Sequence, residues 1–134
     1  MIAVRYRLDT DTCIYAINVR PPAVLDRFLA HESDGIGISA VTVCELYFGV
    51  RKSASRRNLL ALEKFLAPLE VADYGRDAAI AYGELRAALA KKGTPIGPLD
   101  TQIAAHALVL GVTLVSNNVR EFRRVPKLRL ENWA

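Results

Sequence analysis

Three carboxylates are set apart from the other charged residues of this sequence. Asp100 is the only formally charged residue within positions 93–119, and Glu45 is the only one within positions 35–50. Asp9 directly follows a short run with the character of a β-strand. Burying an unpaired charge costs several kcal/mol. The placement of these three residues in apolar sequence therefore indicates that they serve a function.

The chemistry of such a site depends on whether the carboxylates meet in the folded protein. Carboxylates brought together repel one another, which raises their pKa values unless a cation lies between them. Oxygen ligands without Cys or His suit Mg²⁺ or Mn²⁺. Such an ion can activate a water molecule for attack on a phosphodiester. We therefore expect a Mg²⁺ or Mn²⁺ site formed by Asp9, Glu45 and Asp100.

Each of these residues alone also has a structural explanation. Asp9 could cap the helix that follows it, and Asp100 could interact with the dipole of its own helix. Glu45, in the middle of a helix, could pair with a buried Arg. Asn117 and Asn118 could form only a turn. The expected joint occurrence of all five at one edge of the sheet favours a shared site.

These residues are positioned by a regular alternation of strands and helices. Strands are predicted at residues 3–8, 36–39, 69–72, 112–116 and 128–130. Helices are predicted at residues 10–19, 23–30, 40–50, 58–67, 76–92 and 98–110, with one turn at 120–124. This alternation predicts a parallel sheet with helices on both faces and a ligand site beyond the carboxyl ends of the strands. Glu45, Val41 and Phe48 share a helical stripe that should face the sheet.

The composition is that of one globular domain. The chain has 134 residues, is 51% apolar and carries a net charge of +4, which excludes disorder and suits an acidic partner such as nucleic acid. Cys13 and Cys44 are expected to be buried free thiols. Most other acidic residues, Glu70 among them, are expected on solvated faces, as is His31. No membrane span or secretory signal is recognisable, so a cytoplasmic protein is expected.

Four segments together resemble the PIN-domain ribonucleases, and within them the VapC toxins of bacterial toxin–antitoxin pairs. The segments are Leu8-Asp9-Thr10, Ser39–Leu46, Pro98–Ala107 and Leu114–Phe122. They occur in the expected order and span almost the whole chain. The resemblance implies one PIN domain over residues 1–134, a three-layer α/β/α fold with a central, mainly parallel sheet of four to five strands.

The resemblance also implies an activity and a set of site residues. It implies a Mg²⁺- or Mn²⁺-dependent endoribonuclease whose acidic metal-site residues are Asp9, Glu45 and Asp100. Asn118 takes the fourth position, where many relatives carry Asp, and Glu121 is a rival for that role. Ser116 stands where Thr is usual, and its hydroxyl could orient the site. Asp11, where Asn is more usual, is expected to cap the helix or to support the site.

The expected substrate is accessible RNA, since unstacked loops are the readable segments. The resemblance implies products with a 5′-phosphate and a 3′-hydroxyl. Seven residues are candidate phosphate contacts: Arg51, Lys52, Arg56, Arg57, Arg120, Arg123 and Arg124. The resemblance further implies a homodimer, a cognate antitoxin with a helix lying near Tyr47 and Phe48, and a higher-order complex of the two proteins.

Two other functions compete with the nuclease. Residues 9–12 also resemble the first motif of haloacid-dehalogenase-type phosphatases, but residues 116–118 lack the late acidic pair of that class. The second alternative is a non-catalytic binding module whose acidic pocket holds an Arg of a partner. His106 lies about 120° around its helix from Asp100, so it is expected to have a structural role.

Overall fold

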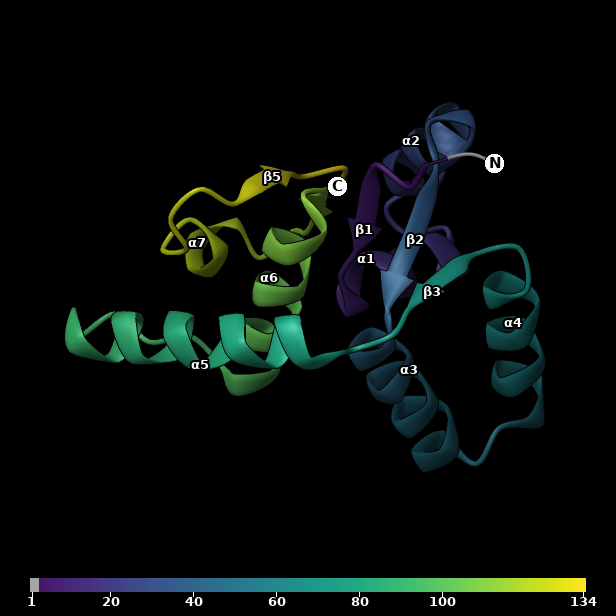
Figure 1. Ribbon diagram of the computed structural model, residues 1–134. Helices are drawn as coiled ribbons and strands as arrows, with labels where there is room; N and C mark the ends of the chain where they lie inside the picture. Colours follow the sequence, from purple (N-terminus) through teal and green to yellow (C-terminus); the bar gives the residue numbers. More distant parts are fainter. Residues whose placement is uncertain (1–2) are drawn as a thin grey trace.

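The computed structural model describes residues 3–134, which form a three-layer α/β/α arrangement (Figure 1). Its centre is a five-stranded sheet of order β3-β2-β1-β4-β5, in which every neighbouring pair is parallel. The strands are β1 (Tyr6–Leu8), β2 (Ile36–Ser39), β3 (Glu70–Ala72), β4 (Thr113–Val115) and β5 (Arg129–Glu131). The predicted fold class is confirmed.

Helices cover both faces of the sheet (Figure 1). One hydrophobic cluster packs against α1 (Thr10–Asn18), α2 (Pro22–His31), α3 (Ala40–Ser53) and α4 (Arg56–Leu66). The other packs against α5 (Arg76–Lys91), α6 (Pro98–Leu110) and α7 (Val119–Phe122). Leu114 and Val115 are neighbours on β4 and belong to different clusters, because successive side chains of a strand point to opposite faces. A short 3₁₀ helix, η1 (Glu32–Asp34), precedes β2.

The carboxyl ends of the parallel strands share one edge of the sheet, and β2 points downward to this edge in Figure 1. Ser39 ends β2 and caps α3 there by accepting the N–H of Val41 at 3.1 Å. α6 begins at the same edge, at Pro98, and runs back to feed β4; it ends at Gly111, whose φ of 68° suits glycine. The start of α6 therefore lies beside the ends of β1 and β2.

An ion pair between a buried Arg and a half-exposed Glu crosses the sheet. The Arg7 side chain is 6% exposed, and its guanidinium donates to the Ile38 carbonyl at 3.0 Å and forms an ion pair with the Glu70 carboxylate. Gly37 leaves room for this side chain, since a Cβ there would lie 2.6 Å from Nη1 of Arg7. Glu70 lies on a solvated face as expected, with its side chain 50% exposed, and β3 sets it two strands away from Arg7, within reach of the guanidinium.

Three side chains differ from the predicted environments. Cys44 is exposed, whereas Cys13 is buried as expected. Phe48 is 69% exposed because α3 extends beyond the strand ends, so the predicted stripe does not face the sheet along its length (Figure 1). His31 is partly buried rather than solvated, and its ring stacks on buried Trp133 at 5.1 Å. Over residues 3–134, no helix combines the length and hydropathy needed to cross a bilayer.

Candidate active site

Asp9 makes two kinds of contact at the end of β1. Oδ1 accepts the backbone N–H of Thr12 at 2.9 Å, which caps α1. Oδ2 accepts the hydroxyl of Ser116 at 2.5 Å, and that Oγ accepts the N–H of Asn118 at 2.9 Å. Ser116 thus holds Asp9 against the loop after β4. Asp11 is exposed and does not cap the helix, since Asp9 already occupies the cap.

Glu45 reaches the same edge from the second turn of α3. The hydroxyl of Thr10 donates to Glu45 Oε1 at 2.6 Å. Thr10 is the first residue of α1 and directly follows Asp9. This hydrogen bond therefore ties the Glu45 carboxylate of α3 to the residue next to Asp9. Thr10 was not predicted from the sequence to have a role of its own. Its position directly after an Asp at a strand end could have indicated that it contacts the site.

Asp100 lies in the first turn of α6, beside Asn118. The Nδ2 of Asn118 donates to Asp100 Oδ2 at 3.4 Å and to Glu121 Oε2 at 3.1 Å. The first distance is long for a hydrogen bond, so Asp100 is only loosely held. Both candidates for the fourth position, Asn118 and Glu121, therefore lie next to Asp100.

The electrostatics of Asp100 indicate one shared site. Burial, the largest cause, raises the pKa of Asp100 from 3.8 to about 6 together with the charges of nearby carboxylates. Those carboxylates are, in order of effect, Glu121, Asp9, Glu45 and Asp11. Burial also raises the pKa of Asp9, against the lowering effect of the hydrogen bonds that it accepts. Such a concentration of like charge favours a positively charged occupant.

Comparison with known proteins gives the family. Residues 6–128 match the PIN domain. The chain belongs to the PIN-domain family. A relative from Salmonella typhimurium (strain LT2), named tRNA(fMet)-specific endonuclease VapC, is 47% identical over 98% of this chain and 99% of its own. Ribonuclease VapC2 from Rickettsia felis is 43% identical over 96% of this chain and 97% of its own.

Solved PIN-domain structures agree with these sequence matches. DNA-bound VapBC from Salmonella typhimurium superposes with a TM-score of 0.91 at 46% identity, covering 98% of this chain and 99% of that one. VapBC2 from Rickettsia felis, bound to a promoter DNA fragment, gives 0.88 at 40% identity, with both chains fully covered. This PIN-domain chain is therefore a ribonuclease and belongs to the VapC toxins. The phosphatase and the non-catalytic module are set aside.

The donors of this PIN-domain site suit a hard divalent cation, since they are carboxylate and amide oxygens. Within residues 3–134, no three acidic, His or Cys side chains lie close enough together to hold an ion as they stand. The carboxylates are instead held by separate hydroxyl and amide partners. Separation is expected of like charges that no cation neutralises, and the raised pKa of Asp100 fits a group whose charged form a cation would stabilise.

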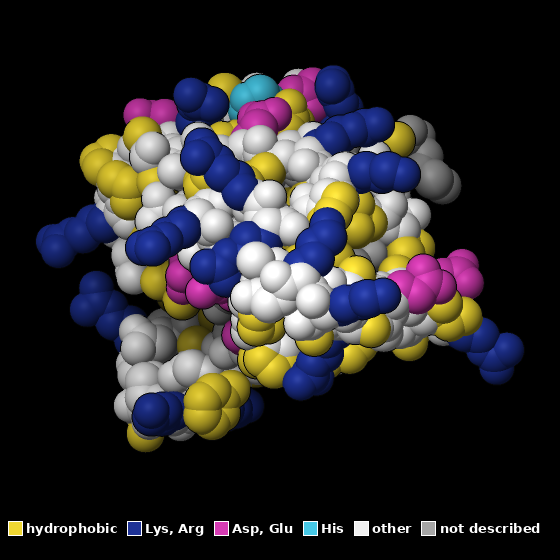
Figure 2. Space-filling model, turned by 90° about the vertical axis from the view of Figure 1, so that its left-hand side faces the viewer, with side chains coloured by type: hydrophobic (Ala, Val, Ile, Leu, Met, Phe, Trp, Pro, Cys, Tyr) yellow, Lys and Arg dark blue, Asp and Glu magenta, His cyan; other side chains and the backbone are white. Residues whose placement is uncertain are grey.

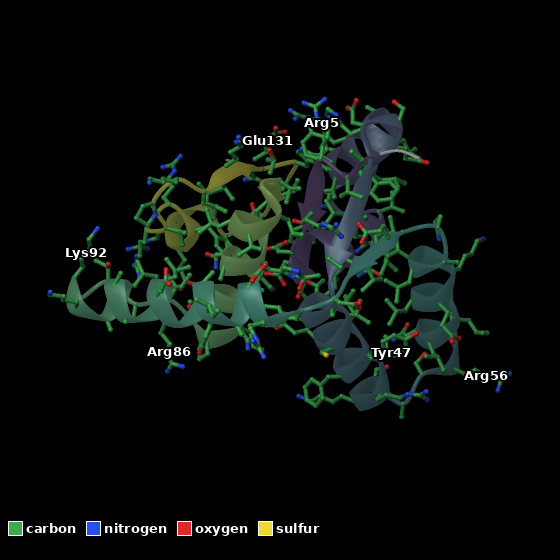
Figure 3. All side chains as sticks on the ribbon, in the orientation of Figure 1. Arg5, Tyr47, Arg56, Arg86, Lys92 and Glu131 are labelled. Carbon is green, nitrogen blue, oxygen red and sulfur yellow. The ribbon has the colours of Figure 1, made fainter. Side chains whose placement is uncertain are left out.

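The predicted basic residues fall into two groups around the PIN-domain site. Arg51 and Lys52 belong to the last turn of α3. Arg56 starts α4 and points outward, far from the strand ends (Figure 3). The second group lies in and after α7, where Arg124 donates to the Pro95 carbonyl at 2.9 Å. The two groups therefore lie on different elements, and Arg56 lies away from the strand ends.

The metal-free PIN domain should gain stability when Asp100 is replaced by Asn. The folded-state pKa of Asp100 is raised to about 6, so its favourable contribution is complete below 3.8 and is lost as the pH rises through about 6. A shift of this size is worth at most about 3 kcal/mol, and we discount it to about 1 kcal/mol because Asp100 is only half-buried.

Urea unfolding in EDTA measures this difference. At about pH 7.5 the Asp100→Asn protein should be the more stable by about 1 kcal/mol, and near pH 4 the two proteins should coincide. Glu84→Gln, on the exposed face of α5, is the control that should show no difference at either pH. A wild-type protein more stable than Asp100→Asn at neutral pH would contradict the assignment of repulsion at this site.

Proposed function

We propose that this ribonuclease is a single PIN domain that cleaves RNA phosphodiester bonds at the strand-end site with Mg²⁺ or Mn²⁺. Asp9, Glu45 and Asp100 would hold the cation, and Asn118 would take the fourth position beside Glu121. The observation that supports this most is the raised pKa of Asp100, which reflects its burial among four other carboxylates. The bound cation would activate a water molecule and neutralise the charge that develops on the phosphate.

Neighbouring side chains would prepare this reaction by holding the carboxylates in fixed orientations. Ser116 fixes Asp9 through its hydroxyl, and Thr10 fixes Glu45. Asn118 lies between Asp100 and Glu121 and reduces their mutual repulsion by donating to both. A cation would replace those donors as the stabilising partner of the carboxylates. The proposed products carry a 5′-phosphate and a 3′-hydroxyl.

The RNA strand is proposed to leave the acidic site across α7 and β5. Arg120 and Arg123 line a hollow of about 720 Å³ there, together with Leu128 and Leu130. This side of the molecule carries many Lys and Arg side chains, and acidic side chains lie in a recess between them (Figure 2). Guanidinium groups suit phosphates and stack on bases, while the leucines offer an apolar surface to an unstacked base.

Replacing Arg120 and Arg123 together by Ala should weaken RNA binding more than catalysis. We expect KM to rise about tenfold, because two phosphate contacts are lost, while kcat changes by less than threefold. The matched control is Arg56→Ala with Arg57→Ala, which removes the same charge at the start of α4. If the control raised KM as much as the α7 pair, net charge rather than the hollow would account for binding.

A structured RNA such as a tRNA is the proposed substrate class. The Salmonella typhimurium relative, 47% identical, is named for its specificity toward tRNA(fMet). Incubation of the purified protein with total tRNA and Mn²⁺, followed by sequencing of the new 5′-phosphate ends, tests this proposal. Cleavage at one position of one tRNA supports it. Digestion of unstructured RNA with tRNA left intact would contradict it.

A cognate antitoxin is the proposed partner, since the solved relatives are VapBC complexes. A hollow of about 620 Å³ between α1, α3 and α4 suits an apolar helix or strand. Its walls include Ile14, Ile17, Leu46, Val50 and Leu62, and Glu45 also lines it. A basic residue of the antitoxin reaching past these walls could pair with the acidic site. A homodimer in the cytoplasm, joined with the antitoxin in a higher-order complex, completes the proposal.

The proposed activity is tested directly on antitoxin-free protein. Wild-type protein with Mn²⁺ should cleave its RNA, and EDTA should stop cleavage and restore it on addition of excess Mn²⁺. Bound metal should also protect the fold, raising the free energy of unfolding by about 2.7 kcal/mol at a hundredfold excess over Kd. Cleavage that persists in EDTA would exclude the proposed metal site.

A further inference from the structure

His106 joins the two helices that carry site carboxylates. It lies on α6, is 2% exposed, and its Nδ1 is 2.7 Å from the Oγ of Ser39, which is itself 4% exposed. Ser39 is the cap of α3, because its Oγ accepts the N–H of Val41. One buried contact therefore connects the N-cap residue of α3 to the middle of α6.

The hydrogen-bond directions in this contact follow from the number of available protons. The ring of His106 also hydrogen-bonds the backbone of Asp73, just after β3. A neutral imidazole that donates to that carbonyl leaves Nδ1 as an acceptor, so Ser39 donates its hydroxyl proton to Nδ1 while accepting from Val41. Burial, followed by the charge of Arg7, lowers the pKa of His106, which keeps the ring neutral.

This contact lies at a similar distance from both carboxylates. Glu45 is six residues beyond Ser39 on α3, and Asp100 is six residues before His106 on α6. At 1.5 Å per residue, each carboxylate is about 9 Å from the contact along its helix. A rigid helix transmits a small rotation at the contact to its carboxylate. The remaining ties on the two carboxylates, to Thr10 and Asn118, do not connect α3 with α6 directly.

A role in filling space alone does not account for this pair. A buried hydroxyl and imidazole cost free energy unless each finds its partner in the right direction, whereas an apolar pair of similar size needs no such geometry. The directional contact therefore fixes one arrangement of α3 against α6. We propose that His106, through Ser39, is a positioning residue that sets the separation of the Glu45 and Asp100 carboxylates for cation binding.

Two isosteric variants separate this role from simple stability. Asn in place of His106 can present an oxygen near the position of Nδ1 and keep the contact with Ser39. Gln reaches toward the position of Nε2 and keeps the contact with Asp73 instead. Both variants lose one ring contact and similar volume. Val24→Ala, buried in α2 away from both helices, is the control for a general loss of stability.

The inference rests on the proposed function, so one readout is independent of activity. In crystals of the metal-free proteins, His106→Gln and Ser39→Ala should change the separation of the two carboxylates by about 1 Å, while His106→Asn should not. Mn²⁺ binding, followed by electron paramagnetic resonance, should weaken about tenfold in the first two variants, with a similar loss of kcat. Val24→Ala should bind Mn²⁺ like the wild type.

The outcomes are distinguishable. An unchanged carboxylate separation in His106→Gln, or equal losses in the Asn and Gln variants that follow their melting temperatures, would overturn the positioning role. A changed separation together with a wild-type protein that cleaves no RNA would instead overturn the proposed function and leave the positioning role in place.

Discussion

Replacing Asp9 by Asn is expected to lower the rate of RNA cleavage by about a thousandfold or more while the protein stays folded. The carboxylate is the buried corner of the acidic site and holds the Ser116 hydroxyl. Loss of its charge removes several kcal/mol of stabilisation from the proposed cation and the developing phosphate charge. Asn caps helices about as well as Asp, so the bond to the Thr12 N–H and the start of α1 should survive.

Single-turnover cleavage at saturating protein measures this rate without a contribution from binding. Circular dichroism and urea unfolding, recorded on the same samples, check that α1 remains intact. Asp11→Asn is the matched control: it makes the same chemical change two residues away at an exposed position, and it should cost less than about tenfold. Wild-type cleavage by Asp9→Asn with Mn²⁺ present would exclude Asp9 as a ligand.

Gly37→Ala should destabilise the protein by about 3 kcal/mol or more. A Cβ at this position would lie 2.6 Å from Nη1 of Arg7 and 2.7 Å from the Glu70 carbonyl oxygen. The backbone oxygen cannot move without disturbing the pairing of β2 with β3, and the guanidinium cannot move without leaving its carboxylate. The substitution therefore strains the sheet or leaves the buried charge of Arg7 without its partner.

Equilibrium urea unfolding of the two proteins gives the difference in the free energy of unfolding. Gly83→Ala is the opposite control, because Gly83 lies within α5 and a Cβ there meets nothing within 4 Å. That change should stabilise the protein by about 0.5–1 kcal/mol, since Ala favours a helix over Gly. A Gly37→Ala protein as stable as the wild type would show that the Arg7 side chain does not need the space beside Gly37.

The sequence was sufficient to predict the sheet and the approach of three carboxylates at one of its edges, because isolated carboxylates are costly. Asp9 followed a strand, Asp100 opened a helix, and Glu45 stood alone within an apolar helix. The parallel order then placed them at one edge, where the structure brings them together. The position of Asn118 beside both Asp100 and Glu121 needed the fold, since a loop of adjacent polar residues can turn in several ways.

The environment of Arg7 could not be predicted from local pattern. Arg5 and Arg7 alternate with apolar residues, which is typical of a strand with one solvated face. β1 is instead the middle strand and is covered on both sides, so Arg7 is buried. The signal was non-local: register places Arg7 opposite Gly37, and Gly37 opposite Glu70. Such a pairing is visible only when three strands are aligned.

The packing of Trp133 has a consequence for the synthesis of this protein. Trp133 is 2% exposed and contacts both Tyr6, on the central strand, and the ring of His31. The hydrophobic cluster beneath β1 is therefore completed by the member of that cluster that is translated last. A nascent chain that stops before residue 133 lacks this side chain, and one that stops before residue 100 also lacks Asp100 and Asn118. During synthesis, the sheet that carries the acidic site therefore lacks part of its core until residue 133 has been translated.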